Sequence, residues 1–177
     1  MKIGILGAGF VGRAIAKLAI GAGHEVMLSI SRSPNALFSL KPMLGCETGT
    51  AQEAARFGEL VVIAVPLTAI DALPKAELQG KPLLDAVNYY PDRDGHIEIL
   101  DTRQTTTSEL VAQTLGTVRV TKAFNAIPMT QLESDGLPQG VANRRALPLA
   151  GDDIEGKRIA AALYDAWLHE TSDAPDK

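Results

Sequence analysis

Apolar and polar positions in the first thirty residues predict a strand, a tight turn, a helix and a second strand. The apolar run Lys2–Leu6 predicts the first strand, and it leads into closely spaced glycines. Apolar residues then recur at spacings of three and four, which is typical of one helix face: Val11, Ala14, Ile15, Leu18 and Ala19. Gly21 and Gly23 end this helix, and Glu25–Ile30 predicts the second strand.

The same alternation continues through the middle of the chain. Leu60–Val65 is a continuous apolar run, typical of a strand that is buried on both faces of a parallel sheet. The other elements expected here are a short third strand at Gly45–Glu47, a helix from Thr50 through Phe57, a weaker helix at Ile70–Leu78, a strand within Lys81–Val87 and a polar, aromatic loop at Asn88–Gly95.

The last third of the chain repeats the pattern less regularly. Thr106 and Glu109 have the spacing of a capping box ahead of a helix at Leu110–Leu115. Strands are expected at Val118–Phe124 and Arg145–Ala150, with an irregular stretch over residues 126–144 between them that forms either a lid or an excursion. Asp152 or Asp153 can cap a final helix whose apolar stripe is Ile159, Leu163, Ala166 and Trp167. This order predicts an α/β fold with a doubly wound, mostly parallel sheet in one domain over residues 1–177.

Composition agrees with an ordinary folded domain. The chain has 177 residues, of which 46% are hydrophobic and 21% are charged, so a disordered or fibrous protein is excluded. Cys46 is the only cysteine, which rules out an intrachain disulfide and a thiolate cluster. No apolar run is long enough to span a membrane, and the start MKIGIL lacks the pattern of an export signal. We therefore expect a cytoplasmic protein without a membrane partner.

The formal charge of −4 is concentrated near the carboxyl terminus. Residues 152–177 contain seven acidic and three basic side chains, whereas residues 1–151 contain 14 of each. A neutral body with an acidic end offers no broad basic face, so we expect no nucleic-acid partner.

The glycine-rich turn carries the clearest chemical signal. Gly7-Ala8-Gly9-Phe10-Val11-Gly12 is a GxGxxG sequence between the first strand and the first helix, the context that dinucleotide binding requires. Gly7 permits the turn, Gly9 lets a pyrophosphate approach the backbone, and Gly12 lets the helix pack against the strand. The helix amino end adds N–H donors and a positive dipole. A tight turn that binds nothing is the alternative.

The end of the second strand favours NADP(H) over NAD(H). NAD sites usually carry an acidic residue there, about 20 residues after the glycines, to bind the ribose hydroxyls. This chain instead has Ser29, Ser31 and Arg32, whose hydroxyls and guanidinium suit a 2′-phosphate. A serine-rich turn with a solvated arginine is the alternative interpretation.

The carboxyl ends of the next strands should line the same crevice. Val65 and Pro66 are expected to line the site of the ribose and nicotinamide. Asn88 is expected to hydrogen-bond the carboxamide or a second ligand. The full set of candidates at these strand ends is Ala64, Val65, Pro66, Leu67, Asn88, Ala123 and Asn125. Ordinary loop packing is an equal alternative for each single residue.

These segments resemble the NADPH-dependent reductases of the deazaflavin coenzyme F420, a family of F420-dependent NADP oxidoreductases. The resemblance covers residues 2–153 and rests on IGILGAGFVG, SISRSP, VVIAVPLTAI, LLDAVNYY and the stretch TTSELVAQTLGTVRVTKAFNAI. It implies that Gly7, Gly9, Phe10, Val11 and Gly12 hold the pyrophosphate, that Ser29, Ser31 and Arg32 hold the 2′-phosphate, that Val65, Pro66 and Leu67 flank the ribose and nicotinamide, and that Ala123 and Asn125 lie at the nicotinamide end.

The resemblance further implies a reaction without a catalytic acid or base. Hydride passes directly between NADP(H) and a stacked deazaflavin or flavin-like acceptor, so orientation and exclusion of water supply the catalysis. The chain departs from the family where it ends soon after the last helix, and Tyr89-Tyr90 replaces a usually small or polar loop. These departures leave the second substrate open, and an incomplete second site suggests a homodimer.

Two other functions fit parts of the sequence. A regulatory module that binds NADP(H) without turnover agrees with the lack of an acid–base constellation, and an imine or carbonyl reductase has a similar amino-terminal domain. His24, His96 and His169 share no metal-like spacing with carboxylates or Cys46, so no metal site is expected. Ser108 is interpreted as a residue of the first helical turn and Trp167 as a core residue.

Overall fold

The sheet is continuous, parallel and built in the expected order. The computed structural model describes residues 1–29 and 40–170 of the chain. Its six-stranded sheet has the order β3-β2-β1-β4-β5-β6, with every pair of neighbouring strands parallel. The strands are β1 Lys2–Leu6, β2 Glu25–Ser29, β3 Glu47–Gly49, β4 Leu60–Ile63, β5 Leu83–Asp85 and β6 Val120–Lys122. This is the doubly wound, Rossmann-type α/β architecture that the alternating pattern predicts.

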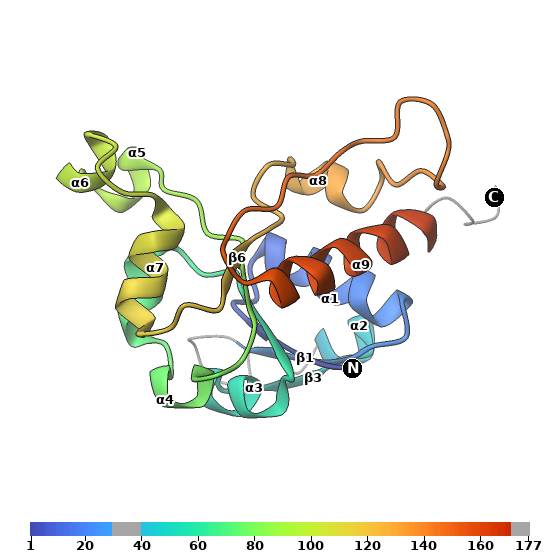
Figure 1. Ribbon diagram of the computed structural model, residues 1–177. Helices are drawn as coiled ribbons and strands as arrows, with labels where there is room; N and C mark the ends of the chain where they lie inside the picture. The colour runs from blue at the N-terminus through green and yellow to red at the C-terminus, as the bar shows by residue number, and fades with distance from the viewer. Residues whose placement is uncertain (30–39, 171–177) are drawn as a thin grey trace.

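Helices cover both faces of the sheet (Figure 1). Those packed on one face are α1 Phe10–Gly21, α2 Leu40–Leu44, α8 Met129–Leu132 and α9 Ile154–Glu170. Those on the other face are α3 Ala51–Phe57, the 3-10 helix η2 Leu67–Ala72, α4 Lys75–Leu78 and α7 Thr107–Leu115. Two single-turn helices, α5 Pro91–Asp94 and α6 Glu98–Asp101, lie beyond α7 at the upper left of Figure 1.

Alternate residues of the central strands divide between two cores. Val62 and Leu84 pack in the core beneath α1 and α9, whereas Val61 and Ile63 pack in the core beneath α3 and α7. All four are fully buried. The continuous apolar run of β4 is therefore a strand with helices on both faces, as its sequence predicts.

The register of the sheet brings five strand ends to one edge. Leu6 pairs with both Ser29 and Ile63, Ile63 pairs with Asp85, and Asp85 pairs with Lys122. Residues that follow these positions consequently meet at the carboxyl edge of the sheet, where open α/β sheets bind their ligands.

Several element boundaries differ from those expected. The third strand is Glu47–Gly49 rather than Gly45–Glu47, and the helix expected over Ile70–Leu78 is split into η2 and α4. The loop expected over Asn88–Gly95 contains α5, and the irregular stretch 126–144 contains α8. The strand expected at Leu60–Val65 keeps only its first four residues, and those expected at Lys81–Val87 and Val118–Phe124 keep only their central three.

The strand expected at Arg145–Ala150 is wrong. Only Ala150 pairs with the sheet, through one antiparallel bridge to Lys122. Leu147 and Leu149 pack instead against the core beneath α1 and α9. In α9, Leu163 and Trp167 are buried as predicted, but Ala166 is exposed.

Over the described residues, no helix has both the length and the apolar character needed to cross a membrane. The single domain over residues 1–177 stays a prediction.

Candidate functional site

The glycine turn closes tightly between β1 and α1. The Gly7 N–H donates to the Ser29 carbonyl at 3.2 Å, and Gly7 has a φ of +113°, which side chains rarely adopt. A Cβ atom on Gly7 would lie 2.4 Å from the Ala64 carbonyl oxygen, and one on Gly12 would lie 1.9 Å from the Gly7 oxygen. Both positions therefore require glycine for steric reasons within the fold itself.

Gly9 differs because no neighbouring atom among the described residues requires a glycine there. Its φ is −70°, and a Cβ atom there would meet no atom within 4 Å. Gly9 is the N-cap of α1, whose first turn has no side-chain cap and no acidic residue. The backbone N–H groups of this turn are thus open toward a space that a pyrophosphate can occupy, with the helix dipole favouring an anion.

A cavity of about 520 Å³ adjoins this turn on the side of β2. Ser29, which is 2% exposed, lines it together with Gly7, Gly9 and the segment Ala64–Pro66. Ser31 and Arg32, the other residues expected at the 2′-phosphate, lie outside the described residues. The position suits an adenosine ribose, since it lies at the end of β2 beside the glycine turn.

A second cavity of about 380 Å³ lies on the other side of the turn, toward β5. Its lining includes predicted residues from three strand ends: Gly9, Phe10, Val11, Ala64, Val65, Pro66 and Asn88. Leu67 and Ala123 line neither cavity, because their side chains are buried in the two cores. Tyr90 and Arg93 also line this cavity and were not predicted.

Asn88 and Asn125 are brought together at the ends of β5 and β6. The Asn88 amide donates to the Asn125 carbonyl at 3.2 Å, and the Asn125 amide donates to Asn88 Oδ1 at 3.5 Å. The preceding residue, Phe124, has a φ of +62°, which is a strained backbone for an aromatic residue. Its N–H donates to Tyr164 Oη at 2.6 Å, and its ring stacks on Trp167 at 5.1 Å between centroids. Helix α9 thereby holds Asn125 in place.

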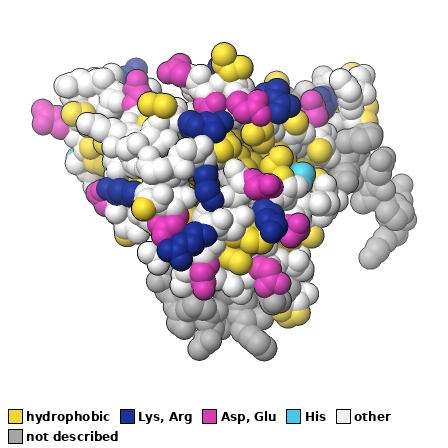
Figure 2. Space-filling view, turned by 60° about the horizontal axis from the view of Figure 1, so that its bottom comes forward, with side chains coloured by type: hydrophobic (Ala, Val, Ile, Leu, Met, Phe, Trp, Pro, Cys, Tyr) yellow, Lys and Arg dark blue, Asp and Glu magenta, His cyan; other side chains and the backbone are white. Residues whose placement is uncertain are grey.

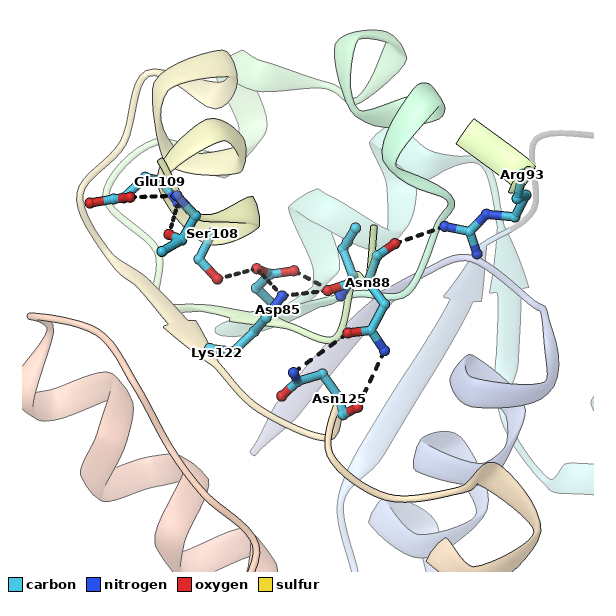
Figure 3. A network of polar contacts seen from close by, with 9 residues as sticks. Asp85, Asn88, Arg93, Ser108, Glu109, Lys122 and Asn125 are labelled. Carbon is cyan, nitrogen blue, oxygen red and sulfur yellow. Dashed lines mark hydrogen bonds and ion pairs between the residues drawn. The ribbon is translucent and has the colours of Figure 1, made fainter. Parts of the chain in front are cut away.

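A buried ionic network fixes the backbone of Val87, immediately before Asn88 (Figure 3). Asp85, which is fully buried, accepts hydrogen bonds from the Val87 N–H at 2.8 Å, from Ser108 Oγ at 2.6 Å and from Lys122 Nζ at 3.0 Å. Lys122 Nζ also donates to the Val87 carbonyl. Val87, the residue that precedes Asn88, is thus fixed at both its N–H and its C=O group.

Arg93 fixes the other side of the same loop. Its guanidinium donates to the Asn88 carbonyl at 2.7 Å, forms an ion pair with Asp94 and lies over the Tyr90 ring at 4.9 Å. The hydrogen bond from Arg93 lowers the pKa of the Asp94 carboxyl and raises that of the Arg93 guanidinium. The loop between β5 and α5 is therefore rigidly placed along the cavity.

Tyr89 anchors the base of this loop rather than the cavity. Its hydroxyl donates to Asp101 Oδ1 at 2.7 Å and accepts from the Ile97 N–H at 2.9 Å. Burial, together with the hydrogen bond to Asp101, raises the Tyr89 pKa, and hydrogen bonds from Tyr89 and His96 lower the Asp101 pKa. His96 is a surface partner of Asp101, at 2.9 Å. Across the residues with assigned positions, no group of three or more His, Cys, Asp or Glu side chains could hold a metal ion.

The described charges are mixed in sign on the face drawn in Figure 2, where basic and acidic side chains lie interspersed around hydrophobic ones. The absence of a nucleic-acid partner stays a prediction.

Solved structures share this architecture. A hypothetical protein, SMa0349, from Sinorhizobium meliloti is 25% identical, with a TM-score of 0.77 over 94% of this chain and 80% of that one. A protein from Arthrobacter sp. FB24, provisionally described as an F420-dependent NADP reductase, is 24% identical, with a TM-score of 0.77 over 96% of this chain and 81% of that one. A pyrroline-5-carboxylate reductase from Streptococcus pyogenes is 18% identical, with a TM-score of 0.65, and this chain covers 56% of it. No curated protein matches the sequence significantly.

The fold and the glycine turn define the class: this is a Rossmann-type dinucleotide-binding protein. Residues 2–89 match the family described as NADP oxidoreductase, coenzyme F420-dependent, and this segment belongs to that family. The family resemblance drawn from the sequence is therefore confirmed over these residues. The stretch Thr106–Ile127 lies beyond the match, so the longer span to residue 153 stays a prediction.

The family match supports NADP-dependent oxidoreduction as the general activity. The residues present also fit the cofactor, since the open N–H groups of α1, the bare backbone at Gly9 and the two flanking cavities accommodate its pyrophosphate and the rings on either side.

Proposed function

We propose that this protein is an NADP(H)-dependent oxidoreductase that moves hydride between the nicotinamide and a deazaflavin or flavin-like acceptor. The observation that carries the proposal is Gly9, a glycine that the fold does not need, at an uncapped helix terminus between two cavities. A purely structural turn would require Gly7 and Gly12 alone. The family match over residues 2–89 supports the same cofactor.

The protein's own groups bind and orient the reactants in this proposal. The first turn of α1 binds the pyrophosphate, and Ser29 with Ser31 and Arg32 binds the 2′-phosphate. Val65 and Pro66 form an apolar wall of the second cavity, and Asn88 lies at its far end with an amide that can bind the carboxamide. Bound NADPH supplies the hydride, so the residues contribute orientation and exclusion of water rather than a catalytic acid or base.

A homodimer and a cytoplasmic location belong to the same proposal. Phe10 and Tyr90 border the second cavity and are 85% and 51% exposed, so its mouth is open in the single chain. A second copy that covers these aromatic side chains would exclude water from the crevice, as hydride transfer requires.

Titration of the purified protein with NADPH and NADH tests the cofactor assignment. We expect NADPH to bind at least tenfold more tightly, about 1.4 kcal/mol, because a 2′-phosphate gains a charge-assisted contact with Arg32. Arg32→Ala should remove this preference and leave NADH binding unchanged. Equal affinity of the unaltered protein for the two nucleotides would refute the role of Ser31 and Arg32.

Turnover separates an enzyme from a regulatory module. The protein is mixed with NADPH and either coenzyme F420, FMN or riboflavin, and oxidation is followed at the nicotinamide absorbance band. We expect oxidation with at least one acceptor. Tight NADPH binding without oxidation by any of them would instead favour the module that senses NADP(H) without turnover.

A further inference from the structure

A third cavity, of about 610 Å³, lies between α7, β6 and residues 150–152. Asn88 lines both this cavity and the one beside the glycine turn, so the two cavities adjoin at Asn88, whereas its partner Asn125 lines the third cavity. The third cavity combines hydroxyl groups with apolar side chains, among them Thr107, Ser108, Val118 and Val120. Its size and mixed lining are typical of a site for a small molecule.

Lys122 places an unused hydrogen-bond donor in this cavity. Its side chain lines the cavity and is 16% exposed. An ammonium group has three N–H donors, and Asp85 and the Val87 carbonyl accept two of them. For the third donor, no acceptor is found among the residues that the structure describes. Asp85 and the Val87 carbonyl hold the ammonium group, and hydrogen bonds from Ser108 and the Val87 N–H in turn hold Asp85 (Figure 3).

Charges around the cavity restrict what can bind there. Glu109 and Asp152 line it, and Lys122 is already paired with Asp85. Hydrogen bonds from the Thr106 N–H and the Thr105 and Thr106 hydroxyls lower the Glu109 pKa, so Glu109 is ionised at neutral pH. An anionic group is therefore disfavoured, whereas an uncharged group that accepts one hydrogen bond is favoured.

We propose that the hydride acceptor binds in this cavity and that Lys122 donates a hydrogen bond to it, at an uncharged ring edge bearing a carbonyl oxygen or an unprotonated nitrogen. This inference rests on the proposed function. Hydride transfer moves one proton and two electrons from the dihydronicotinamide, which becomes oxidised nicotinamide, to C5 of a deazaflavin or N5 of a flavin. The acceptor then carries the negative charge until a solvent proton neutralises it, and the Lys122 N–H stabilises that charge.

Binding without turnover provides the test. Riboflavin and coenzyme F420 are titrated separately against the protein saturated with NADP⁺, and binding is followed by quenching of the ligand's fluorescence. We expect Lys122→Met to weaken binding of the better ligand 10- to 100-fold, as for loss of a charged hydrogen bond of about 1.5–3 kcal/mol. NADPH affinity should fall less than acceptor affinity, because Lys122 acts on the cofactor only through the Val87 carbonyl next to Asn88. Lys75→Met, which removes an exposed lysine paired with Asp71, is the control that should change neither affinity.

A double variant separates ligand contact from support of Asp85. Lys122→Met alone leaves the Asp85 carboxylate buried without its cation, which can destabilise the fold. In Asp85→Asn/Lys122→Met the buried charge is removed, so the fold is retained. We expect the double variant still to bind the acceptor 10- to 100-fold more weakly, with a smaller loss of NADPH affinity. Recovered acceptor binding in the double variant would overturn the inference, because Lys122 would then only neutralise Asp85.

The unaltered protein distinguishes this inference from the proposed function. If it oxidises NADPH with riboflavin or coenzyme F420, but Lys122→Met and the double variant bind that acceptor as tightly as the unaltered protein, the assignment of the third cavity is refuted while the proposed function stands. If it does not bind NADPH, the proposed function itself is refuted.

Discussion

At the scale of single residues, the glycines of the turn have two different roles. The fold requires Gly7 and Gly12 for steric reasons, whereas Gly9 is proposed to serve cofactor binding. Gly9→Ala places a methyl group in open space with an accessible φ, so the free energy of unfolding should change by less than about 0.5 kcal/mol. NADPH binding should weaken at least tenfold, about 1.4 kcal/mol, because the methyl group occupies the space of the pyrophosphate. Urea unfolding and a fluorescence titration measure the two effects.

Gly12→Ala is the matched variant for Gly9→Ala. Its methyl group would lie 1.9 Å from the Gly7 oxygen, so α1 must shift away from β1. We expect a loss of about 3 kcal/mol in the free energy of unfolding, as for an overpacked interior. If Gly9→Ala destabilises the protein as much as Gly12→Ala, Gly9 is structural and the main argument for the cofactor site fails.

Tyr164 makes stability depend on alkaline pH. Burial raises its pKa from 10.0 in the unfolded chain to about 12. The contribution of the neutral hydroxyl is therefore complete below pH 10 and is lost as pH rises through about 12, amounting to about 3 kcal/mol. In Tyr164→Phe this loss should disappear, although the Phe124 N–H loses its acceptor at a cost of about 1–2 kcal/mol at pH 8.

Urea unfolding at pH 8, 10 and 11.5 measures this dependence. Tyr90→Phe is the control, since Tyr90 is 51% exposed and its replacement should leave the pH dependence of the unaltered protein in place. An identical alkaline loss in Tyr164→Phe and in the unaltered protein would show that other groups cause it.

Residue patterns predict only those site residues whose neighbours are close in sequence. The glycines are recognisable because their turn is local, and Asn88 and Asn125 because each follows an apolar strand. Asp85, Ser108 and Lys122 come from three different elements, and their contacts exist only after β5 and β6 pair. The only sequence signal for this network is Asp85, an acidic residue at the end of an apolar strand. An acidic residue in that position does not identify the side chains that contact it.

At the scale of elements, two capping boxes fix where helices begin. Thr50 and Thr106 each accept from the N–H three residues on, and Glu53 and Glu109 each accept from the N-cap N–H. Thr50→Ala and Thr106→Ala should each lower the free energy of unfolding by about 1 kcal/mol. Thr130→Ala, at an exposed position of α8, should change it by less than about 0.5 kcal/mol in the same urea unfolding experiment. Equal effects of all three variants would contradict the capping roles.

The elements that the sequence misplaces have physical causes. Pro74 lacks an N–H donor and restricts Leu73 to an extended backbone, which divides the helix expected over residues 70–78. In the run 145–150, Leu147 and Leu149 are partly buried by packing against the core beneath α1 and α9 rather than by pairing in the sheet. Apolar character predicts burial in both cases, whereas hydrogen-bond partners decide whether a strand or a helix forms.

At the scale of the whole molecule, the carboxyl edge of a single sheet supplies the cofactor site and the third cavity. The glycine turn follows β1, Val65 and Pro66 follow β4, and Asn88 and Asn125 follow β5 and β6. Parallel register aligns these ends, so the approximate place of the site follows from the order of strands and helices alone. The place of the third cavity, beside α7, does not follow from this order, because residues 150–152 reach the cavity through one antiparallel bridge.

A ligand that binds residues from several strand ends should stabilise the whole sheet at once. At an NADPH concentration 100 times its dissociation constant, we expect the free energy of unfolding to rise by about 2.7 kcal/mol. One domain predicts a single unfolding transition in urea that shifts entirely with NADPH, as followed by both circular dichroism and the fluorescence of Trp167 in α9. Gly9→Ala at the same NADPH concentration should shift much less. A second transition that NADPH leaves unmoved would mean that α9 and the segment before it unfold separately, and the single domain over residues 1–177 would then be wrong.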